Sequence, residues 1–311
     1  MEKLIVSSSP HIHSGASTQR IMLDVIIALL PATIASVVLF GLKSLLIVAV
    51  SVTAAVLSEF LFNLICKKKQ TVGDLSAVVT GLLFALNLPS SVTVWQTIVG
   101  AVFAIVVVKC LFGGIGCNFA NPAITARVFV LIAFASSVGG GSQPAFADSD
   151  LVASATPLEA MKNGAELPSL LDMLLGNRGG AIGETCAVAL ILGFVYLVVR
   201  RVIHWHTPVI FVGSVFVLSF LIGGFDVTYA TYQILSGGLI IAAIFMATDY
   251  STTPTNSLGK MIFALGCGII TVLIRQFGSY PEGVSFAILF MNILAPYIEA
   301  WTRRRPLGGK K

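Results

Sequence analysis

The chain has 311 residues, of which 56% are hydrophobic and only 11% are charged. An ordinary soluble domain carries about 25% charged residues, so this composition excludes a disordered chain, a nucleic-acid-binding module and most soluble enzymes. The net charge of +5 would suggest an anionic partner for a soluble protein, but here the Lys and Arg residues lie in short segments between apolar runs. The chain is therefore predicted to be an all-α integral membrane protein, with the lipid bilayer as its surroundings and no nucleic-acid partner.

The first apolar run follows directly on a polar segment that ends in Arg20. It carries Asp24 and Pro31 and has no clear small-residue cleavage site, so it is interpreted as a retained first span and not as a signal peptide. About ten transmembrane helices are predicted from the ten apolar runs, which are 21–41, 44–65, 75–88, 92–111, 122–137, 182–199, 207–224, 234–247, 258–274 and 283–300.

Two of these runs, 75–88 and 234–247, are too short to cross a membrane unaided. Fourteen helical residues extend about 21 Å at 1.5 Å per residue, whereas the hydrocarbon core is about 30 Å thick. Each short run breaks into polar, Pro-containing sequence, at 87–91 and at 249–254. The broken helices are thus the third and the eighth, five spans apart.

Matching breaks five spans apart predict two five-helix repeats. Because five is odd, the second copy must be inverted in the membrane, which is a common transporter arrangement. The predicted organisation is a cytoplasmic N-terminal segment, a first repeat, an extracytoplasmic loop, a second repeat and a basic cytoplasmic tail, at 1–20, 21–137, 138–181, 182–300 and 301–311.

The basic residues predict the orientation. Clusters at 67–69, 200–201 and 303–305 follow the second, sixth and tenth runs. With both termini in the cytoplasm, fifteen of the 19 Lys and Arg residues face the cytoplasm, and four do not: Lys43, Lys162, Arg178 and Arg275. This distribution agrees with the positive-inside rule, which the inverse topology would violate.

Four charged residues lie within or at the edges of spans: Asp24, Glu59, Arg127 and Glu184. A charge inside a span marks a functional site by default, because its burial costs free energy. Three of them, Asp24, Arg127 and Glu184, lie near span ends. The alternative interpretation for these three is that their side chains extend to the membrane–water interface. The five cysteines are scattered without a CxxC pair, so neither a disulfide framework nor a metal site is indicated.

Three polar, irregular segments are expected to meet at the cytoplasmic pole: 9–13, 113–122 and 249–254. Irregular backbone at membrane depth is tolerated only where it is buried in protein or lines a cavity. Amides and hydroxyls there could hold a polar ring system or an ion. The alternative interpretation is that they only cap the ends of their own helices.

The long outer loop contains a helix-start pattern. Thr156 is predicted to be an N-cap, Pro157 the first helical residue, and Glu159 the partner that closes a capping box. This predicts a short helix over LEAMKNG, and a helix cap needs no further role.

The segment from Asp150 to Thr156 also resembles a flavin-attachment motif, D-x-x-[ST]-G-A-T. It occurs in the membrane flavoproteins of Rnf complexes and of Na⁺-translocating NADH:quinone oxidoreductases. Asp150, Ala155 and Thr156 match, whereas Ala153 and Ser154 depart from the pattern. The stretches 9–32, 113–123 and 245–255 are also similar to the RnfD family of Rnf electron-transport complexes, in the same order; the related quinone-reductase proteins have a longer N-terminal extension.

This resemblance implies two flavins. An FMN would be joined by a phosphoester to Thr156, placed there by a dedicated flavin transferase, with Asp150, Ser154 and Ala155 beside it. A second flavin, riboflavin in the family, would bind non-covalently near the cytoplasmic side, and the expected contacts are Asn118, Asn121, Asp249 and Thr252. No catalytic residue and no metal ligand are expected.

The implied function is that of an electron-carrying subunit of an ion-translocating ferredoxin:NAD oxidoreductase. The chain would not be catalytic alone, would need the other membrane and peripheral Rnf subunits, and would lie in the cytoplasmic membrane of a bacterium or archaeon. The main alternative is a flavin-free channel or transporter of the inverted-repeat type, since architecture alone does not establish redox work. A structural assembly subunit without a cofactor is a third interpretation.

Overall fold

The computed structural model describes residues 17–139, 142, 144, 156–164, 167–278 and 282–303. Within these ranges the chain is helical apart from turns, loops and an isolated bridge between Ser142 and Gly180. The predicted all-α class is therefore confirmed. The segment 9–13 and the motif residues Asp150, Ser154 and Ala155 lie outside the described residues.

The part before the long loop has six α-helices, one short 3₁₀ turn and one π-helical stretch. They are α1 (Thr18–Phe40), α2 (Leu42–Ile65), the 3₁₀ turn η1 (Val72–Asp74), α3 (Ser76–Leu86), α4 (Val94–Val102), the π-helix η2 (Phe103–Cys110), α5 (Pro122–Ala133) and α6 (Ala135–Val138).

The remaining helices begin within the long loop. They are α7 (Pro157–Asn163), α8 (Leu170–Leu175), α9 (Ala187–Val199), α10 (His206–Ile222), α11 (Val227–Leu235), α12 (Leu239–Ile241), the π-helix η3 (Ala242–Met246), α13 (Ser257–Phe277) and α14 (Val284–Thr302). The short helices α8 and α11 were not predicted.

Each of the ten predicted apolar runs contains a helix, but only some of these helices can cross a membrane by length alone. Among the described residues, α1, α2, α13 and α14 are long and apolar enough. The pair formed by α11 and α12–η3 qualifies as a fifth span, bent by 67° at its break. Five further apolar helices are shorter: α3, α4–η2, α5, α9 and α10.

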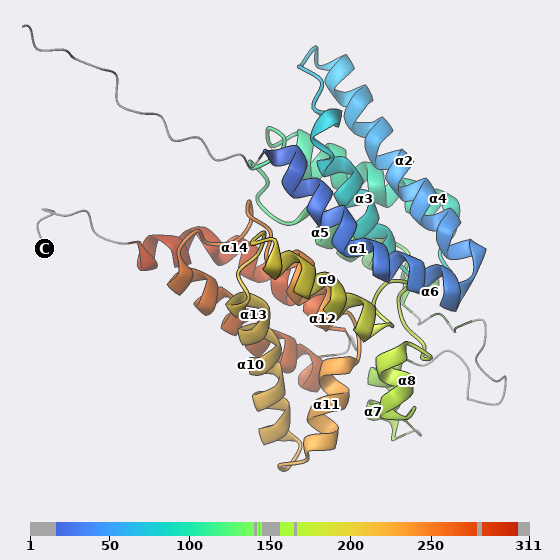
Figure 1. The fold of residues 1–311 in the computed structure, drawn as a ribbon, viewed down its shortest axis with the longest axis vertical. Coiled ribbons are helices and arrows are strands. Elements are labelled where there is room, and N and C mark those ends of the chain that lie inside the picture. Colours follow the sequence, from blue (N-terminus) through green and yellow to red (C-terminus); the bar gives the residue numbers. More distant parts are fainter. Residues whose placement is uncertain are drawn as a thin grey trace, which may run out of the picture.

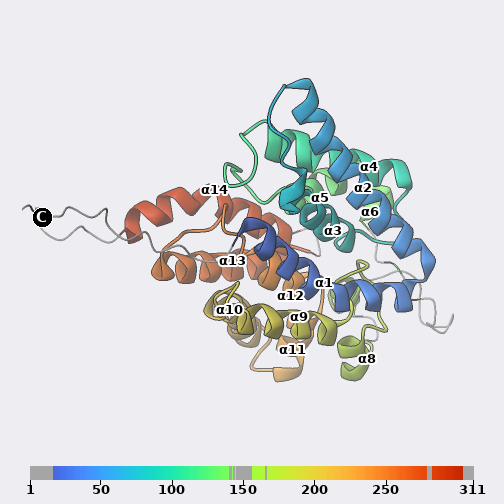
Figure 2. The ribbon, with the colours of Figure 1, turned by 45° about the horizontal axis from the view of Figure 1, so that its top comes forward.

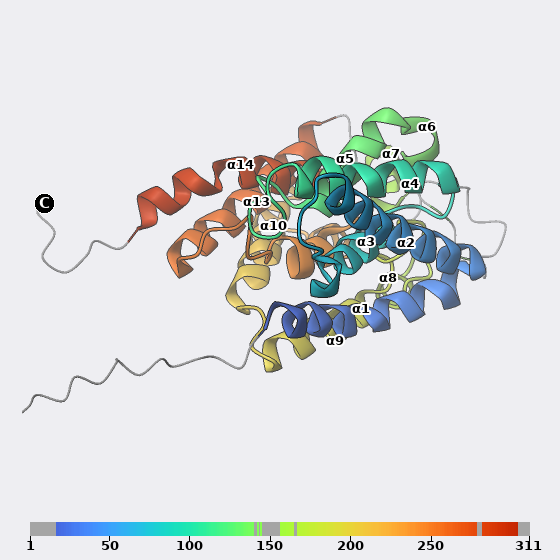
Figure 3. The same ribbon diagram turned by 90° about the horizontal axis from the view of Figure 1, so that it is seen from above.

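The molecule has two poles, seen from three directions in Figures 1, 2 and 3. At the first pole α1 begins and α14 ends, and α7 and α8 lie toward the opposite, second pole. The helix α1 packs along α9, so the first described helix contacts the second half of the chain. In the first half α2 packs on α3 and α4, and in the second half α10 packs on α11 and α13.

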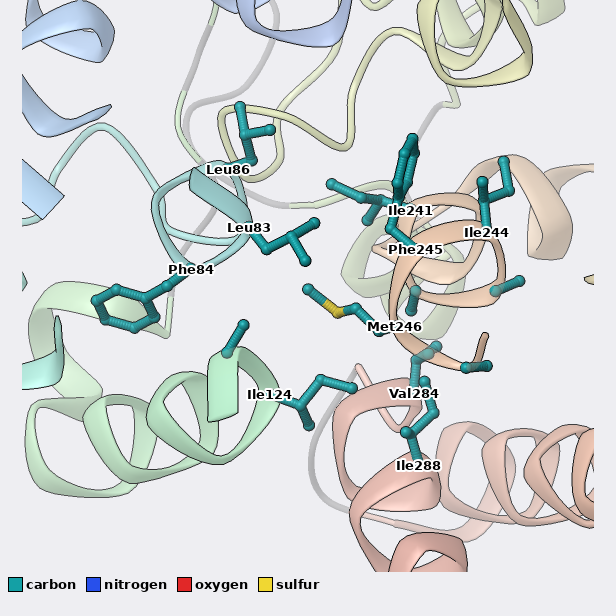
Figure 4. Close-up of a cluster of buried hydrophobic side chains, with 14 of the residues drawn as sticks. Leu83, Phe84, Leu86, Ile124, Ile241, Ile244, Phe245, Met246, Val284 and Ile288 are labelled. Atoms are coloured by element: carbon teal, nitrogen blue, oxygen red, sulfur yellow. The ribbon is translucent and has the colours of Figure 1, made fainter. Parts of the chain in front are cut away.

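The two short helices α3 and η3 meet near the centre of the molecule. Figure 4 shows the side chains of Leu83 and Met246 pointing toward one another, whereas the Phe245 ring points away from them and lies beside Ile241. All four side chains are buried. The side chain of Asn87, at the end of α3, donates to the Met246 sulfur across 3.9 Å. The two broken helices are thus joined by apolar packing and lie between the poles.

Candidate cofactor sites at the two poles

A pocket at the first pole brings together three of the residues singled out from the sequence. Its walls come from α1, α3, η2 and the segments before α5 and after η3, and it encloses about 760 Å³, part of which is open to the surface. Asn118, Asn121 and Asp249 all line it. We call it the first-pole pocket; its other polar lining includes Ser76, Thr80, Lys109, Thr248, Tyr250 and Ser251.

The two asparagines of this pocket differ in what their side chains do. Asn121 is the N-cap of α5, and its side-chain oxygen accepts from the main-chain N–H groups of Ala123 at 3.0 Å and Ile124 at 3.3 Å. This is the capping role that the sequence left open. The side-chain oxygen of Asn118 is buried and has no hydrogen-bond partner among the described residues. A buried acceptor without a partner is unfavourable, so Asn118 is suited to an N–H group of a ligand.

Asp249 organises the loop that follows η3. Its carboxylate accepts from the Ser251 hydroxyl and from the Thr252 hydroxyl, both at 3.1 Å. Removal from bulk water raises the pKa of the Asp249 carboxyl above its ordinary value, and the hydrogen bonds from Ser251 and Thr252 oppose that rise.

Thr252 does not line the first-pole pocket, but it is buried next to it. Asn292 of α14 lies between the two loops. Its amide group donates to the Thr252 carbonyl at 3.1 Å and accepts from the Asn121 main-chain N–H at 3.1 Å. Asn292 therefore holds together the two irregular segments that the sequence predicted would meet.

A buried ion pair at the wall of the pocket was not predicted as a pair. Lys109 of η2 is 2% exposed, and its ammonium donates to Glu59 at 2.8 Å and to Ser76 at 2.6 Å. Thr71 donates to the second oxygen of Glu59 at 2.5 Å. The sequence marked Glu59 as an intramembrane charge, but Lys109 counted only as a cytoplasmic positive charge, because its partner lies fifty residues away.

The second pole holds Thr156, the predicted attachment residue. Thr156 caps α7, because its hydroxyl accepts from the Glu159 N–H at 3.4 Å and its own N–H donates to the Glu159 carboxylate at 3.0 Å. The predicted capping box is confirmed. Lys162 of the same helix donates to the carbonyl of Gly278 at 2.8 Å, which fastens α7 to the end of α13.

A network of charged side chains lies near the break between α11 and α12. Arg127 contacts the carboxylates of Glu282 and, at 3.6 Å, Glu184, and it donates to Asn87 at 2.9 Å. Arg178 donates to the Glu184 carbonyl at 2.9 Å. We call this set, together with Arg275, the second-pole charge network. Arg127 and Glu184 are buried with partners here, so they do not reach the interface as the alternative interpretation proposed.

The glycines at the break allow these charges to approach the backbone. A Cβ on Gly238 would stand 2.7 Å from the Glu184 carboxylate and 2.9 Å from the Arg127 guanidinium. A Cβ on Gly237 would stand 2.9 Å from the Leu158 side chain of α7 and 3.1 Å from that of Arg275. The helix that begins at Thr156 is therefore packed directly against the break in the eighth predicted span.

The chain matches the family model described as "NQR2, RnfD, RnfE family" over residues 5–308. It is 44% identical, over 99% of its length and 96% of the relative's, to the D subunit of the Na⁺-translocating ferredoxin:NAD⁺ oxidoreductase complex of Acetobacterium woodii. It is 35% identical to the proton-translocating counterpart of Clostridium ljungdahlii, over 98% and 96% of the two chains. It is 33% identical to the D subunit of the ion-translocating oxidoreductase complex of Aliivibrio salmonicida, over 98% of its own length and 99% of the relative's.

Proposed function

Because the chain belongs to the NQR2, RnfD, RnfE family, we propose that it is the D subunit of an ion-translocating ferredoxin:NAD⁺ oxidoreductase complex. In this role it carries electrons through the membrane between an FMN on Thr156 and a riboflavin near the first pole, and it is not catalytic alone. Its relatives are named for Na⁺ in one case and for protons in another, so the proposal leaves the ion open.

The observation that carries the proposal is the position of Thr156. It ends a segment similar to a flavin-attachment motif, and it lies toward the pole opposite the pocket formed by Asn118, Asn121 and Asp249. A dedicated flavin transferase is the implied partner for the attachment. Two sites at opposite poles are the arrangement that electron transfer across a membrane requires.

Other subunits are implied as partners. The sequence has no cysteine cluster that could ligate iron and no G-x-G-x-x-G segment after a strand. Electrons must therefore arrive from, and leave to, other membrane and peripheral subunits of the complex.

In the membrane, the proposal places the first pole in the cytoplasm, with both termini there, in the cytoplasmic membrane of a bacterium or archaeon. The ten predicted spans form two inverted repeats, 21–137 and 182–300, joined by the outer loop 138–181 and flanked by 1–20 and 301–311. Similar packing supports the repeat, since α2 contacts α3 and α4 while α10 contacts α11 and α13.

The first-pole pocket has groups that fit a flavin ring. A flavin, when bound, supplies the electron-accepting ring system, and the protein supplies its position and electrostatics. The unpartnered Asn118 oxygen would accept from a ring N–H, and Asp249 and Thr252 shape the opposite loop. Lys109, which is paired with Glu59, also lines the pocket. The apolar side chains of Val25 and Phe245 line the same space.

Thr156→Val tests the covalent flavin. Valine has nearly the shape of threonine but no hydroxyl, so the variant should lose in-gel flavin fluorescence, which a covalent flavin retains after SDS. The lost cap should cost about 1 kcal/mol of local stability, so the protein should still accumulate in the membrane. Ferredoxin-to-NAD activity of the complex should fail.

Ser169→Ala is the matched control, because Ser169 caps α8 near the same pole with its hydroxyl accepting from Asp172 at 3.2 Å. This variant should keep full fluorescence. Fluorescence that persists in Thr156→Val would show that Thr156 is only a helix cap. A blank gel for the unmodified protein would favour the alternative, a flavin-free channel or transporter.

Acid extraction tests the second flavin. The purified subunit should release riboflavin in addition to the flavin that stays bound to the protein, and Asn118→Leu should lower the released amount severalfold. Asn177→Leu, which changes an exposed asparagine outside the pocket, should release the same amount as the unmodified protein. Recovery of the covalent flavin alone would contradict the proposal for the first-pole pocket.

A further inference from the structure

A second pocket lies beside the helix that Thr156 begins. It encloses about 830 Å³, part of it open to the surface, between α7, α11 and α13. We call it the second-pole pocket; its lining includes Leu158, Lys162, Tyr229, Gln233, Arg275 and Gln276. Most of these side chains carry hydrogen-bonding groups, which distinguishes this pocket from the apolar contact between α3 and η3.

The polar groups of the wall are partly paired with one another. The Gln233 amide donates to the Tyr229 hydroxyl at 3.2 Å, and that hydroxyl donates to Gln276 at 3.4 Å. Arg275 uses its two terminal nitrogens on the carbonyls of Gln233 and, at 3.0 Å, of Ser236, at the end of α11. Its Nε–H has no hydrogen-bond partner among the described residues, although Arg275 is only 4% exposed.

The surrounding charges leave an excess of positive charge. The second-pole charge network contains three arginines, Arg127, Arg178 and Arg275, and two glutamates, Glu184 and Glu282. At the pocket wall itself Lys162 and Arg275 are the two charged lining residues, and Glu159 lies three residues before Lys162 on α7. Among the described residues the Arg275 Nε–H is a buried donor without a hydrogen-bond partner, which is unfavourable, so this wall suits an anionic or hydrogen-bond-accepting ligand.

We propose that the second-pole pocket receives the ring of the flavin carried by Thr156, with Arg275 as a positioning residue that faces its acceptor edge. This rests on the proposed function. The carbonyl oxygens and ring nitrogens of a flavin accept hydrogen bonds, and uptake of two electrons and one proton leaves the reduced ring with one negative charge. A cation beside the ring stabilises that anion, and tuning of this kind is what a protein contributes to a flavin.

The second-pole pocket lies within reach of a flavin attached to Thr156. Leu158, two residues after Thr156, is itself part of the pocket wall. A Cβ added to Gly237 would stand 2.9 Å from the Leu158 side chain and 3.1 Å from that of Arg275, so both side chains approach the same glycine, and Lys162 joins α7 to Gly278 after α13. The sugar-alcohol chain between phosphate and ring then needs to extend only from the start of α7 to its adjacent face.

Filling the pocket tests the proposal in the full chain. Gln276 is exposed and lines the pocket, so Gln276→Trp should displace the ring without disturbing the core. In-gel fluorescence should stay unchanged, whereas quenching of the native flavin by iodide should increase severalfold. Gln70→Trp, at an exposed glutamine outside the pocket, should leave the quenching unchanged.

The charge of Arg275 is tested by the midpoint potential of the covalent flavin. Arg275→Gln should favour the oxidised form about tenfold, which for two electrons lowers the potential by about 30 mV. Arg275→Lys keeps the positive charge and should therefore have a potential close to that of the unmodified protein. If Arg275→Gln does not fold, Lys162→Gln should lower the potential in the same direction.

The outcomes separate the two proposals. A fluorescent gel with equal iodide quenching in the unmodified protein, Gln276→Trp and Gln70→Trp would overturn the pocket assignment and leave the attachment at Thr156 intact. Unchanged potentials in the charge variants would overturn the role of Arg275. A blank gel for the unmodified protein would remove the proposed function itself.

Discussion

Two ion pairs show how differently a charge pair behaves at different depths. Lys109 and Glu59 are 2% and 1% exposed and also bond to Ser76 and Thr71. The pair of Asp24 and Arg200 is 3.3 Å apart, but the Arg200 side chain is 56% exposed. Water screens the second pair and not the first, so the same chemistry has unequal consequences for stability.

Removing one partner of the buried pair should strongly destabilise the protein. Lys109→Met leaves Glu59 as an uncompensated charge, and the expected loss is about 3–5 kcal/mol. The double variant Lys109→Met with Glu59→Gln should recover much of this loss, because no isolated charge remains. Thermal unfolding in detergent, followed by fluorescence-detected chromatography, measures the stability loss of the single variant and its recovery in the double variant.

Arg200→Gln is the control for that series and should lower the melting temperature much less. A single Lys109→Met variant as stable as the Arg200 variant would show that this pair is solvated in the membrane protein, contrary to the structure.

At the scale of the elements, close approach between helices depends on individual glycines. Gly193 of α9 faces α1, and a Cβ there would stand 2.3 Å from the Ala28 carbonyl oxygen and 3.1 Å from the Phe245 ring. The same glycine therefore brings α9 against both the first span and the broken eighth span. In contrast, a Cβ on Gly213 of α10 would meet nothing within 4 Å.

These two glycines give opposite predictions for the same substitution. Gly193→Ala should destabilise the protein by about 1–3 kcal/mol, because the added methyl group overpacks the contact with α1. Gly213→Ala should be neutral or stabilising by up to about 1 kcal/mol, since alanine favours a helix interior. Thermal unfolding of the two variants, measured side by side, tests these predictions. Equal changes in melting temperature would refute the close contact between α1 and α9.

At the scale of the whole molecule, the proposed orientation can be measured with native cysteines. Cys66 and Cys117 are exposed and lie in segments assigned to the first pole, whereas Cys110 and Cys267 are buried. A membrane-impermeant maleimide should label Cys66 and Cys117 in inverted vesicles and not in intact cells.

Asn163→Cys, in a chain without its native cysteines, is the reporter for the second pole because Asn163 is exposed at the end of α7. It should be labelled in intact cells, with the opposite dependence on vesicle orientation. Labelling of both poles from the same side would contradict the proposed topology.

The sequence by itself determined the features that depend on neighbouring residues. Apolar runs predicted the membrane-embedded helices because burial of a helix requires apolar side chains along its whole length. The capping box of Thr156, Pro157 and Glu159 was predictable because its hydrogen bonds span three residues. The helix α11 was not predicted, because its sequence, VTYATYQIL, mixes polar and apolar residues. The inverted repeat and the flavin contacts stay predictions.

Only the tertiary structure decided which distant groups meet. Arg127 and Glu282 are separated by 155 residues, and nothing local in either segment specifies the other as its partner. The same holds for the free Asn118 oxygen, whose lack of a partner among the described residues depends on the surrounding packing. Local patterns specify helices and caps because their interactions are short in sequence, whereas the two pockets and the charge network arise where helices cross, since long-range contacts are set by the packing of the entire chain.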